Sequence, residues 1–506
     1  MIRAHPAHLE HDPSRVVARF FLPGDGLPSS HSRVTQIVAR VLESPTRLTQ
    51  EAADRVVAEL TERHAGAADL ILANARAVGS RVRGSARLTE SQALVLGAAF
   101  TAEYAVEGAA LCNPSAVVHP YQDGLAPDQL RVAIALRCIG EGHISSIGFA
   151  EAVIDADDTW TFAPRAAPIT GPAVSVGDWS RHHFGRSLEH EGHLNDLANA
   201  VLSDLPERFT GVELEQAILS LPDQLSTRPD SRGPTQALRD MAASAYHADF
   251  PAAVPLSARV LLPVAAEEDH GMEDARFVRF TDEDGTIGYR ATYTAYDGQD
   301  IAPRLITSPD LSAFAIHRLT GTGARNKGMA LFPRLVGGHH LALSRTDGEN
   351  ISLARSADGV IWDDLGILHR PTELWELVQL GNCGAPIETD EGWVVLTHGV
   401  GPLRTYSLGA LMLDLDHPSK VIARSTAPLL QPTGDLRDGY VPRVVYSCGA
   451  ILHRKTLWIP VGVGDARIQI FSVPIDELIA SKTRLSSNSD LRATRRIGPG
   501  ESDTGS

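Results

Sequence analysis

The strongest constraint on this chain is a long stretch, residues 253–479, built almost entirely of short apolar runs separated by turn signals. Runs such as GWVVLTHGV and TLWIPVGVG have the length and alternation of strands. The sequences DEDG, TDG, ADG and DEG between such runs are typical hairpin turns. The stretch therefore predicts a mainly β fold.

A weak repeat within this stretch narrows the architecture. The segments ITSPDLSAF and ARSADGVIWDD share a Ser-x-Asp turn, and their serines, Ser308 and Ser356, lie 48 residues apart. A period of about 40–50 residues with about four short strands per repeat is typical of a β-propeller blade. The stretch has room for about five such blades. The alternative is a pair of β-sandwiches in which the turns resemble one another by chance.

Helical segments flank and interrupt the strand-rich region. Apolar residues recur at helical spacing in RVTQIVARVLESP and EAADRVVAELTERH, and we predict a helical N-terminal region over 1–110. The propeller domain is predicted over 111–480, with a helical insertion at about 170–250. The tail, 481–506, is rich in Ser, Arg and Gly without periodicity, and we predict that it is disordered.

Charge and cysteine content exclude several classes of function. Lys and Arg number 46 against 62 Asp and Glu, a formal net charge of −16 over 506 residues. This balance argues against general binding to nucleic acid or to an anionic membrane. No apolar run approaches the ~20 residues of a membrane span. The four cysteines are widely spaced and form no CxxC, which predicts reduced thiols in a cytoplasmic protein.

An acidic segment, EEDHGMEDAR, precedes a predicted strand and contains the first candidates for chemistry. Because side chains alternate faces along a strand, one of Glu273 and Asp274 can point into a central cavity. A carboxyl group placed there, beside Arg276 and apolar walls, suits a general acid. The simpler alternative is a solvated acidic turn.

Four cationic residues lie beside apolar or small residues: Arg137, Arg304, Lys327 and Arg345. Cations in such surroundings usually serve a partner. If several converge, they form an oxyanion or phosphate pocket. If they do not, each belongs to a separate salt bridge, and the linear sequence leaves both interpretations open.

The histidine-rich segment HHFGRSLEHEGH superficially resembles a metal site. A helix can present His190 and His193 together, but the segment lacks HExxH and has no cysteine partner. We interpret it as a solvated helical face and predict no metal. The glycines of GEGHISSIG lack the spacing of a nucleotide phosphate loop, so no cofactor is predicted either.

Several ordered motifs carry a resemblance to a known family. They are CNPSAVVHP, GMEDARFVRF, NKGMALFPRLVGGHHLALSR, LGNCGAPIETDEGWVVLTHGV, GYVPRVVYSCGA and VGVGDARIQIFSV. In this order they resemble the β-mannoside phosphorylases of glycoside hydrolase family 130, over about residues 110–165 and 255–480. The resemblance implies a five-bladed β-propeller with a central, funnel-like active site. The helical N-terminal region and the helical insertion lie outside the shared core.

The resemblance also implies an inverting reaction on β-mannosides, in which inorganic phosphate attacks the anomeric carbon and α-mannose 1-phosphate is formed. The catalytic acid of the family's Glu-Asp-Pro-Arg motif falls on Asp274, with Ala275 in place of the proline. Only this one protein acid is required, because phosphate replaces an activated water. Around it we predict substrate-binding residues at Asn113, Arg137, Glu273, Arg276 and Asp465.

The same resemblance places phosphate-binding residues at Lys327 and Arg345, with Arg304 expected on a neighbouring strand. One position departs from the family, because the His that precedes the Arg is Ser344 here. A serine hydroxyl still donates one hydrogen bond. Phosphate is therefore expected as a co-substrate, together with a β-mannoside oligosaccharide.

Two alternatives stay open on the sequence. Without a phosphate pocket the protein is an inverting β-mannoside hydrolase, which needs a second carboxylate such as Glu388 or Asp438. With a decayed site it is a non-catalytic carbohydrate-binding propeller. Geometry distinguishes the classes, because the predicted site residues of an enzyme line one cavity. The helical additions are candidates for a homo-oligomer interface.

Overall fold

The structure of the protein is a computed structural model. It describes residues 2–22, 30–64, 66–79, 88–165, 168–228 and 231–484. Of the tail predicted to be disordered, residues 485–506 lie outside the described part. The tail is ordered before that point, where β30 (Thr483–Arg484) pairs with β25 (Val421–Arg424).

Antiparallel hairpins form five meanders within the described ranges, which confirms the mainly β prediction. The first contains β4 (Ala110–Val118), β5 (Leu130–Ile139), β6 (Ser145–Ile154) and β7 (Trp160–Phe162). The second contains β13 (Gly271–Thr281), β14 (Ile287–Tyr296), β15 (Ile301–Ser308) and β16 (Ala313–Arg318). The third contains β17 (Ala330–Leu331), β18 (His340–Ser344), β19 (Ile351–Ser356) and β20 (Asp363–His369).

The last two meanders each begin with two short strands that pair with the same neighbour. The fourth contains β21 (Gln379–Asn382), β22 (Ile387–Thr389), β23 (Gly392–Gly401), β24 (Thr405–Leu413) and β25. The fifth contains β26 (Val445–Tyr446), β27 (Ile451–His453), β28 (Thr456–Val463), β29 (Arg467–Pro474) and β1 (Arg3–Glu10).

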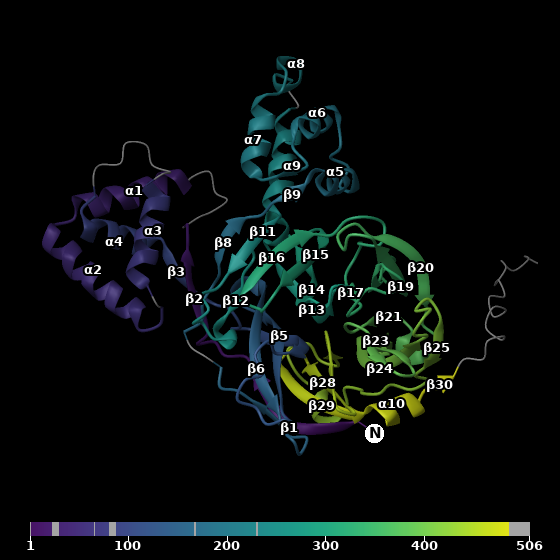
Figure 1. The fold of residues 1–506 in the computed structure, drawn as a ribbon. Helices are drawn as coiled ribbons and strands as arrows, with labels where there is room; N and C mark the ends of the chain where they lie inside the picture. Colours follow the sequence, from purple (N-terminus) through teal and green to yellow (C-terminus); the bar gives the residue numbers. More distant parts are fainter. Residues whose placement is uncertain are drawn as a thin grey trace, which may run out of the picture.

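Backbone contacts join each meander to the next, so that the five lie in a ring (Figure 1). Bridges or hydrogen bonds make these joints at Ser145–Gly271, Thr281–Arg334, Glu349–Leu380, Tyr406–Val444 and Gly449–Ser115. The first joint requires a glycine. Gly271 has a φ of +136°, and a Cβ there would lie 2.6 Å from the Ser145 amide nitrogen.

The repeat found in the sequence corresponds to one meander. Ser308 and Ser356 end the third strand of the second and third meanders. Each hydroxyl accepts a hydrogen bond from a backbone amide three residues on, at 2.8 Å and 2.9 Å. The 48-residue period therefore marks equivalent turns of consecutive sheets, and the DEDG and TDG signals likewise connect paired strands.

The start of the chain differs from the prediction of a helical region over 1–110. β1 pairs with β29 and completes the fifth meander, and β2 (Val16–Phe20) pairs with β3 (Thr101–Ala105). The residues of β1 alternate between more and less exposed positions, as expected of an edge strand with one covered face. The first residues form a strand because they pair with β29, near the other end of the chain. The local periodicity of the sequence cannot predict such a pairing.

Two helical groups lie outside the ring (Figure 1). The N-terminal group contains α1 (Ser30–Glu43), α2 (Thr46–Thr61), α3 (Ala67–Gly79) and α4 (Glu90–Ala99). The inserted group contains α5 (Arg181–His190), α6 (Asp196–Asp204), α7 (Gly211–Leu219), α8 (Asp223–Ser226) and α9 (Arg232–Ala243). Both confirm the helical segments read from the sequence, and the insertion packs around its own apolar core, which includes Trp179 and Phe184.

Short strands attach the insertion to the ring. β8 (Ala173–Val176) and β11 (Tyr246–Asp249) pair with each other, and β11 pairs with β16. The remaining short strands and α-helix are β9 (Trp179–Ser180), β10 (Arg208–Phe209), β12 (Val260–Leu261) and α10 (Ile475–Ala480).

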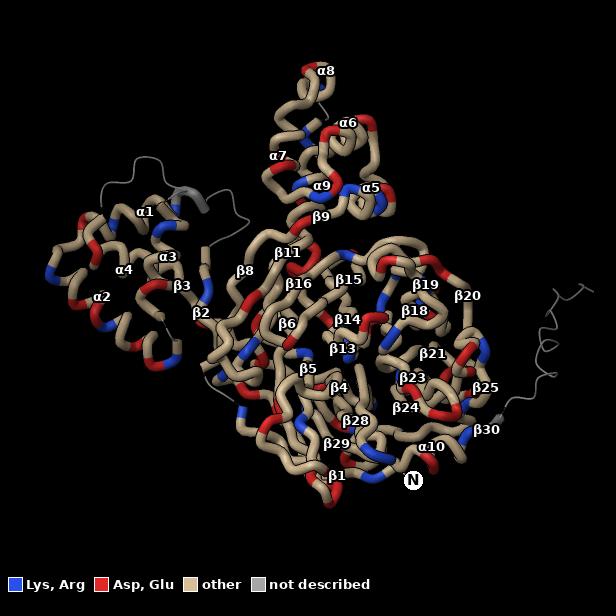
Figure 2. The backbone as a smooth tube through the Cα atoms, in the orientation of Figure 1, with Lys and Arg blue, Asp and Glu red and all other residues tan. Residues whose placement is uncertain are grey.

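Acidic and basic residues are interspersed over the ring and the helices (Figure 2). None of the described helices is long and apolar enough to cross a membrane. All four cysteines are buried free thiols.

Candidate active site

A cavity of about 450 Å³ is bordered by residues from all five meanders and therefore lies at the centre of the ring. Eight of the nine predicted site residues line it: Asn113, Arg137, Glu273, Asp274, Arg276, Lys327, Arg345 and Asp465. The sequence analysis did not select the other polar or aromatic lining residues, Asn326, Gln379, His398, Arg404, Tyr406 and Tyr446. Most lining residues belong to a strand that begins its meander or to loops at strand ends.

Two β-bulges set the direction of the Asn113 and Asp274 side chains. The pairing of β4 with β5 shifts register between Cys112 and Ser115, and Asn113 lies in that bulge. The pairing of β13 with β14 shifts in the same way around Asp274. Asn113 and Asp274 have φ values of +49° and +56°, a left-handed conformation that Asn and Asp tolerate better than most residues.

The same left-handed conformation recurs around the cavity. Asn326, Arg404 and Asp465 have φ values of +63°, +55° and +48°. Such residues cost conformational energy and cluster at functional sites, where the surrounding structure holds them. The backbone around the cavity is therefore built to present particular side chains.

Arg137 fixes the carboxylates of Glu273 and Asp274 by hydrogen bonds. Its guanidinium donates to Glu273 Oε1 at 2.8 Å and to Asp274 Oδ1 at 3.1 Å, and its Nε donates to the Ser145 hydroxyl at 2.9 Å. Asn113 Nδ2 also donates to Asp274 Oδ1, at 2.6 Å. The first meander thereby fixes both carboxylates of the second, as charge-assisted hydrogen bonds allow.

The two cavity aspartates have pKa values shifted in opposite directions. Burial alone would raise the pKa of Asp274, but the charges of Arg137 and Arg276 and the hydrogen bond from Asn113 outweigh it and lower that pKa. Burial raises the pKa of Asp465 to about 6, and the negative charge of Asp274 adds to that increase. The cavity therefore holds one carboxyl group whose pKa is lowered and one whose pKa is raised.

Two buried guanidinium groups in the cavity have no carboxylate partner in the described part of the chain. Arg276 donates to the Tyr446 hydroxyl at 2.8 Å and to the Asp274 carbonyl oxygen at 3.0 Å. Arg345 donates to the Gly348 carbonyl oxygen at 2.5 Å. Both side chains are buried, and the Nε of each has no hydrogen-bond partner there. Buried cations without counter-ions are suited to an anionic ligand.

Lys327 differs, because Glu273 already accepts from its ammonium group at 2.6 Å. The lining residues nevertheless carry an excess of two positive charges. The cations are Arg137, Arg276, Lys327, Arg345 and Arg404, against the carboxylates of Glu273, Asp274 and Asp465. In a chain with a net charge of −16, this excess is a local feature of the cavity.

His398 on β23 supplies an imidazole that the sequence analysis missed. Burial lowers the pKa of His398 well below its usual range, with help from Arg345 and Arg276, so the ring is neutral and its Nδ1 has no partner among the described residues. A Cβ at Gly381 would lie 2.4 Å from His398 Cε1 and 2.8 Å from Arg345 Cδ. The imidazole and Arg345 therefore pack against the same backbone.

The available signal for His398 was a single polar aromatic residue inside the apolar strand GWVVLTHGV.

Ser344, at the position next to Arg345, does not line the cavity and is fully buried. The expectation that its hydroxyl faces phosphate is not met.

Arg304 is the predicted site residue that the structure places elsewhere, so its assignment to phosphate is wrong. It lies in the middle of β15, the third strand of its meander, and is fully buried. Its guanidinium pairs with Glu268 at 2.7 Å and Glu267 at 3.2 Å and donates to the Ser244 carbonyl oxygen. The alternative of a separate salt bridge holds for this residue, which ties the helical insertion to the second meander.

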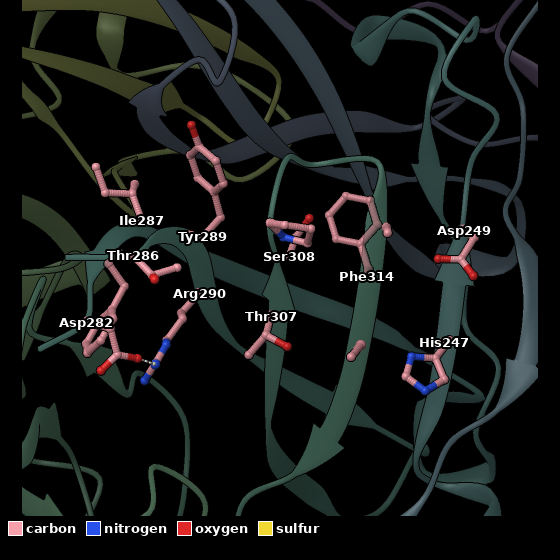
Figure 3. A pocket seen from close by; sticks show the side chains of 15 residues that line it. His247, Asp249, Asp282, Thr286, Ile287, Tyr289, Arg290, Thr307, Ser308 and Phe314 are labelled. Carbon is pink, nitrogen blue, oxygen red and sulfur yellow. Dashed lines mark hydrogen bonds and ion pairs between the residues drawn. The ribbon is translucent and has the colours of Figure 1, made fainter. Parts of the chain in front are cut away.

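A second cavity, of about 430 Å³, lies on the face formed by β14, β15, β16 and β11 (Figure 3). None of the predicted site residues lines it, and its Arg290 is paired with Asp282 at 3.1 Å. Among the described residues, no group of three or more His, Cys, Asp or Glu side chains is placed to hold a metal ion.

Carboxylates and uncompensated cations that converge on one cavity are the equipment of an enzyme that cleaves glycosidic bonds. The cavity therefore has the groups that a carbohydrate-active enzyme needs. The comparisons with known proteins then define the family.

A family model described as beta-1,4-mannooligosaccharide phosphorylase, of glycoside hydrolase family 130, matches residues 254–483. A 1,2-beta-oligomannan phosphorylase of Thermoanaerobacter sp. (strain X514) is 34% identical over 40% of this chain and 68% of its own length. A beta-1,2-mannobiose phosphorylase of the same organism is 33% identical over 42% and 69%. Another, of Listeria innocua, is 31% identical over 43% and 62%. The chain therefore belongs to glycoside hydrolase family 130.

The placement of Arg304 generates a stability prediction. Arg304→Met leaves the carboxylate of Glu268 buried without its cation, which we expect to lower the free energy of unfolding by about 3–5 kcal/mol. Arg334→Met is the matched control, because it breaks a half-exposed pair with Glu388 and should cost at most about 1 kcal/mol. Urea unfolding followed by circular dichroism measures both. Equal losses in the two variants would contradict the placement.

The raised pKa of Asp465 generates a prediction about pH. A carboxyl whose folded pKa is raised stabilises the fold at pH below its unfolded value, and that contribution is lost as pH rises through about 6. The stability of the wild type relative to Asp465→Asn should therefore fall between about pH 4 and pH 7. Thermal unfolding of both proteins across this range is the measurement. A difference that is constant or grows with pH would show that Asp465 is not held in this way.

Proposed function

We propose that the protein cleaves β-mannosidic bonds by phosphorolysis with inversion, yielding α-mannose 1-phosphate. In this proposal the five meanders are the blades of a five-bladed β-propeller with the active site at its centre. The three relatives described above are named for phosphorylases of β-1,2-linked mannans or mannobiose, which supports β-1,2-linked mannosides as the substrate class.

The observation that carries the proposal is the pair of buried guanidinium groups, Arg276 and Arg345, that lack carboxylate partners in the described ranges. Phosphate entering an acidic protein needs such a local cationic site. Lys327 and neutral His398 border the same cavity and supply further hydrogen-bond donors. Arg304 and Ser344 are not part of this site.

Asp274 acts as the general acid in this proposal. In the free protein the neighbouring cations lower its pKa, which keeps it ionised. Bound phosphate compensates those cations and the bound sugar excludes water, and both effects raise the pKa of a carboxyl group. Asp274 can then hold the proton that the leaving oxygen takes up. Asn113 and Arg137 orient it, and Asp465 lines the cavity as a sugar-binding residue.

The hydrolase alternative receives less support. Glu388 pairs with Arg334 at 2.5 Å, and neither Glu388 nor Asp438 lines the cavity. Both oxygens of Glu273 are taken by cations, Oε1 by Arg137 and Oε2 by Lys327, which suits a structural role better than activation of water. The non-catalytic alternative is disfavoured by the convergence of Asn113, Arg137 and Asp274 on one cavity.

The phosphate requirement is the direct test. We expect cleavage of β-1,2-mannobiose to depend on phosphate, and Arg345→Met to raise the KM for phosphate at least about tenfold with a much smaller change in the KM for mannobiose, because one charge-assisted contact is lost. Initial rates at varied phosphate give both constants. Arg334→Met removes an equivalent guanidinium outside the cavity and should leave both unchanged. Equal rates with and without phosphate, with free mannose as the only product and no mannose 1-phosphate, would establish the hydrolase alternative.

The role of Asp274 has its own test. Asp274→Asn removes the transferable proton but keeps the size of the side chain, so kcat should fall about 10²–10⁴-fold while the sugar still binds. Steady-state rates and calorimetric titration with mannobiose separate the two effects. Near-normal turnover of mannobiose by this variant would refute the assignment.

A further inference from the structure

The sheet of the second meander ends on an uncharged edge strand, β8, which lies between the two helical groups (Figure 1). In the described part of the chain, β11 is the one strand that pairs with β8. All four residues of β8 are exposed, Val174 by 48% and Val176 by 66%. Natural edge strands usually carry a charge, a bulge or a cover that prevents further pairing. An exposed apolar edge without a charge is typical of an interaction surface.

Backbone hydrogen bonds show which residues of β8 face the free edge. Gly177 N–H donates to the Ala245 carbonyl oxygen, just before β11, at 2.9 Å. In an antiparallel pair, residues that bond to the neighbouring strand alternate with residues that do not. Ser175 therefore also turns its backbone groups toward β11. Those of Val174 and Val176 point to the free edge.

The sequence of this edge is symmetric about Ser175, with a valine on each side and then Ala173 and Gly177. Antiparallel pairing with β8 of a second copy, about a two-fold axis at Ser175, places Val174 opposite Val176 of the partner subunit. The two valines are the residues whose backbone groups face the edge, so each such pair exchanges two hydrogen bonds. The free backbone groups of β8 therefore match a second copy of the same strand.

The two ends of β8 add complementary apolar surfaces on one face of the sheet, since Val174 and Val176 point to the same side. A Cβ on Gly211 would lie 3.8 Å from Val176 Cγ1, so the start of α7, with its 67% exposed Val212, lies beside Val176. Val174 borders a largely apolar groove of about 440 Å³ whose lining includes Val264. Because antiparallel strands run in opposite directions, the two-fold axis brings the start of α7 of each copy to the groove of the other.

We propose that β8 forms the contact of a two-fold symmetric dimer, in which the two strands pair about Ser175 and each α7 packs its first turn on the groove of the partner subunit. Charge favours this surface for self-association. Each chain has a net charge of −16, so two copies repel one another, whereas residues 171–177 contain no charged side chain. The dimer does not depend on the reaction proposed for the cavity.

Cysteine cross-linking tests the position of the two-fold axis. In Ser175→Cys the new thiols belong to facing residues whose Cα atoms lie about 4.5 Å apart, within the range of a disulfide. We expect a covalent dimer on a non-reducing gel after oxidation with glutathione disulfide. The native cysteines are buried and contribute little background. Ala173→Cys is the matched control, because Ala173 is also exposed but lies about 14 Å along the strand from its own copy.

Analytical ultracentrifugation tests the interface without a cross-link. We expect the wild-type protein to dimerise at micromolar concentration and Val176→Lys to raise the Kd of the dimer at least about tenfold, because each interface then buries two unpaired charges. Leu374→Lys adds the same charge at a 77% exposed leucine of the fourth meander and should change this Kd less than about twofold.

Three results would each overturn the interface. The first is a wild-type protein that sediments as a monomer at every concentration tested. The second is a dimer that Val176→Lys weakens no more than Leu374→Lys does. The third is cross-linking of Ser175→Cys that is no faster than that of Ala173→Cys.

Discussion

The contact of Arg137 with Glu273 and Asp274 determines how the rest of the site is arranged. It joins the first meander to the second at the centre of the ring, beside the close approach of Gly271 to Ser145. The two bulges that present Asn113 and Asp274 are fixed against this cation. The lowered pKa of Asp274 is a consequence of these neighbours. In the proposed function, a bound anion that compensates the neighbouring cations raises this pKa again.

The charge distribution explains how an acidic protein can take an anionic substrate. The cavity, lined from all five meanders, carries an excess of positive charge, while acidic and basic residues are interspersed over the described parts of the ring and the helices (Figure 2). Arg304 has a different function although its local sequence resembles that of the cavity cations. Its guanidinium donates to the Ser244 carbonyl oxygen at the end of the helical insertion and pairs with Glu268 just before the second meander, away from the cavity.

The sequence predicted the fold class and most of the site, because both depend on patterns that a linear sequence carries. Hairpin turns and the spacing of Ser308 and Ser356 marked the sheets, and family motifs located Asn113, Asp274 and Lys327. The strand β1 was missed because its partner β29 lies at the other end of the chain. Arg304 was misplaced because sequence does not show how far a strand lies from the ring centre, and His398 was missed because burial beside Arg345 is a tertiary property.

The central claim is that phosphate, held by Arg276 and Arg345, is the nucleophile of an inverting reaction. The measurement that addresses it most directly is ³¹P and ¹H nuclear magnetic resonance of the first product formed from β-1,2-mannobiose and phosphate. If phosphate is the nucleophile, a new phosphorus signal appears that is coupled to an α-configured anomeric proton, from α-mannose 1-phosphate. Free mannose as the only product, two molecules per mannobiose with no phosphate ester, would contradict it, and so would a β-configured phosphate ester.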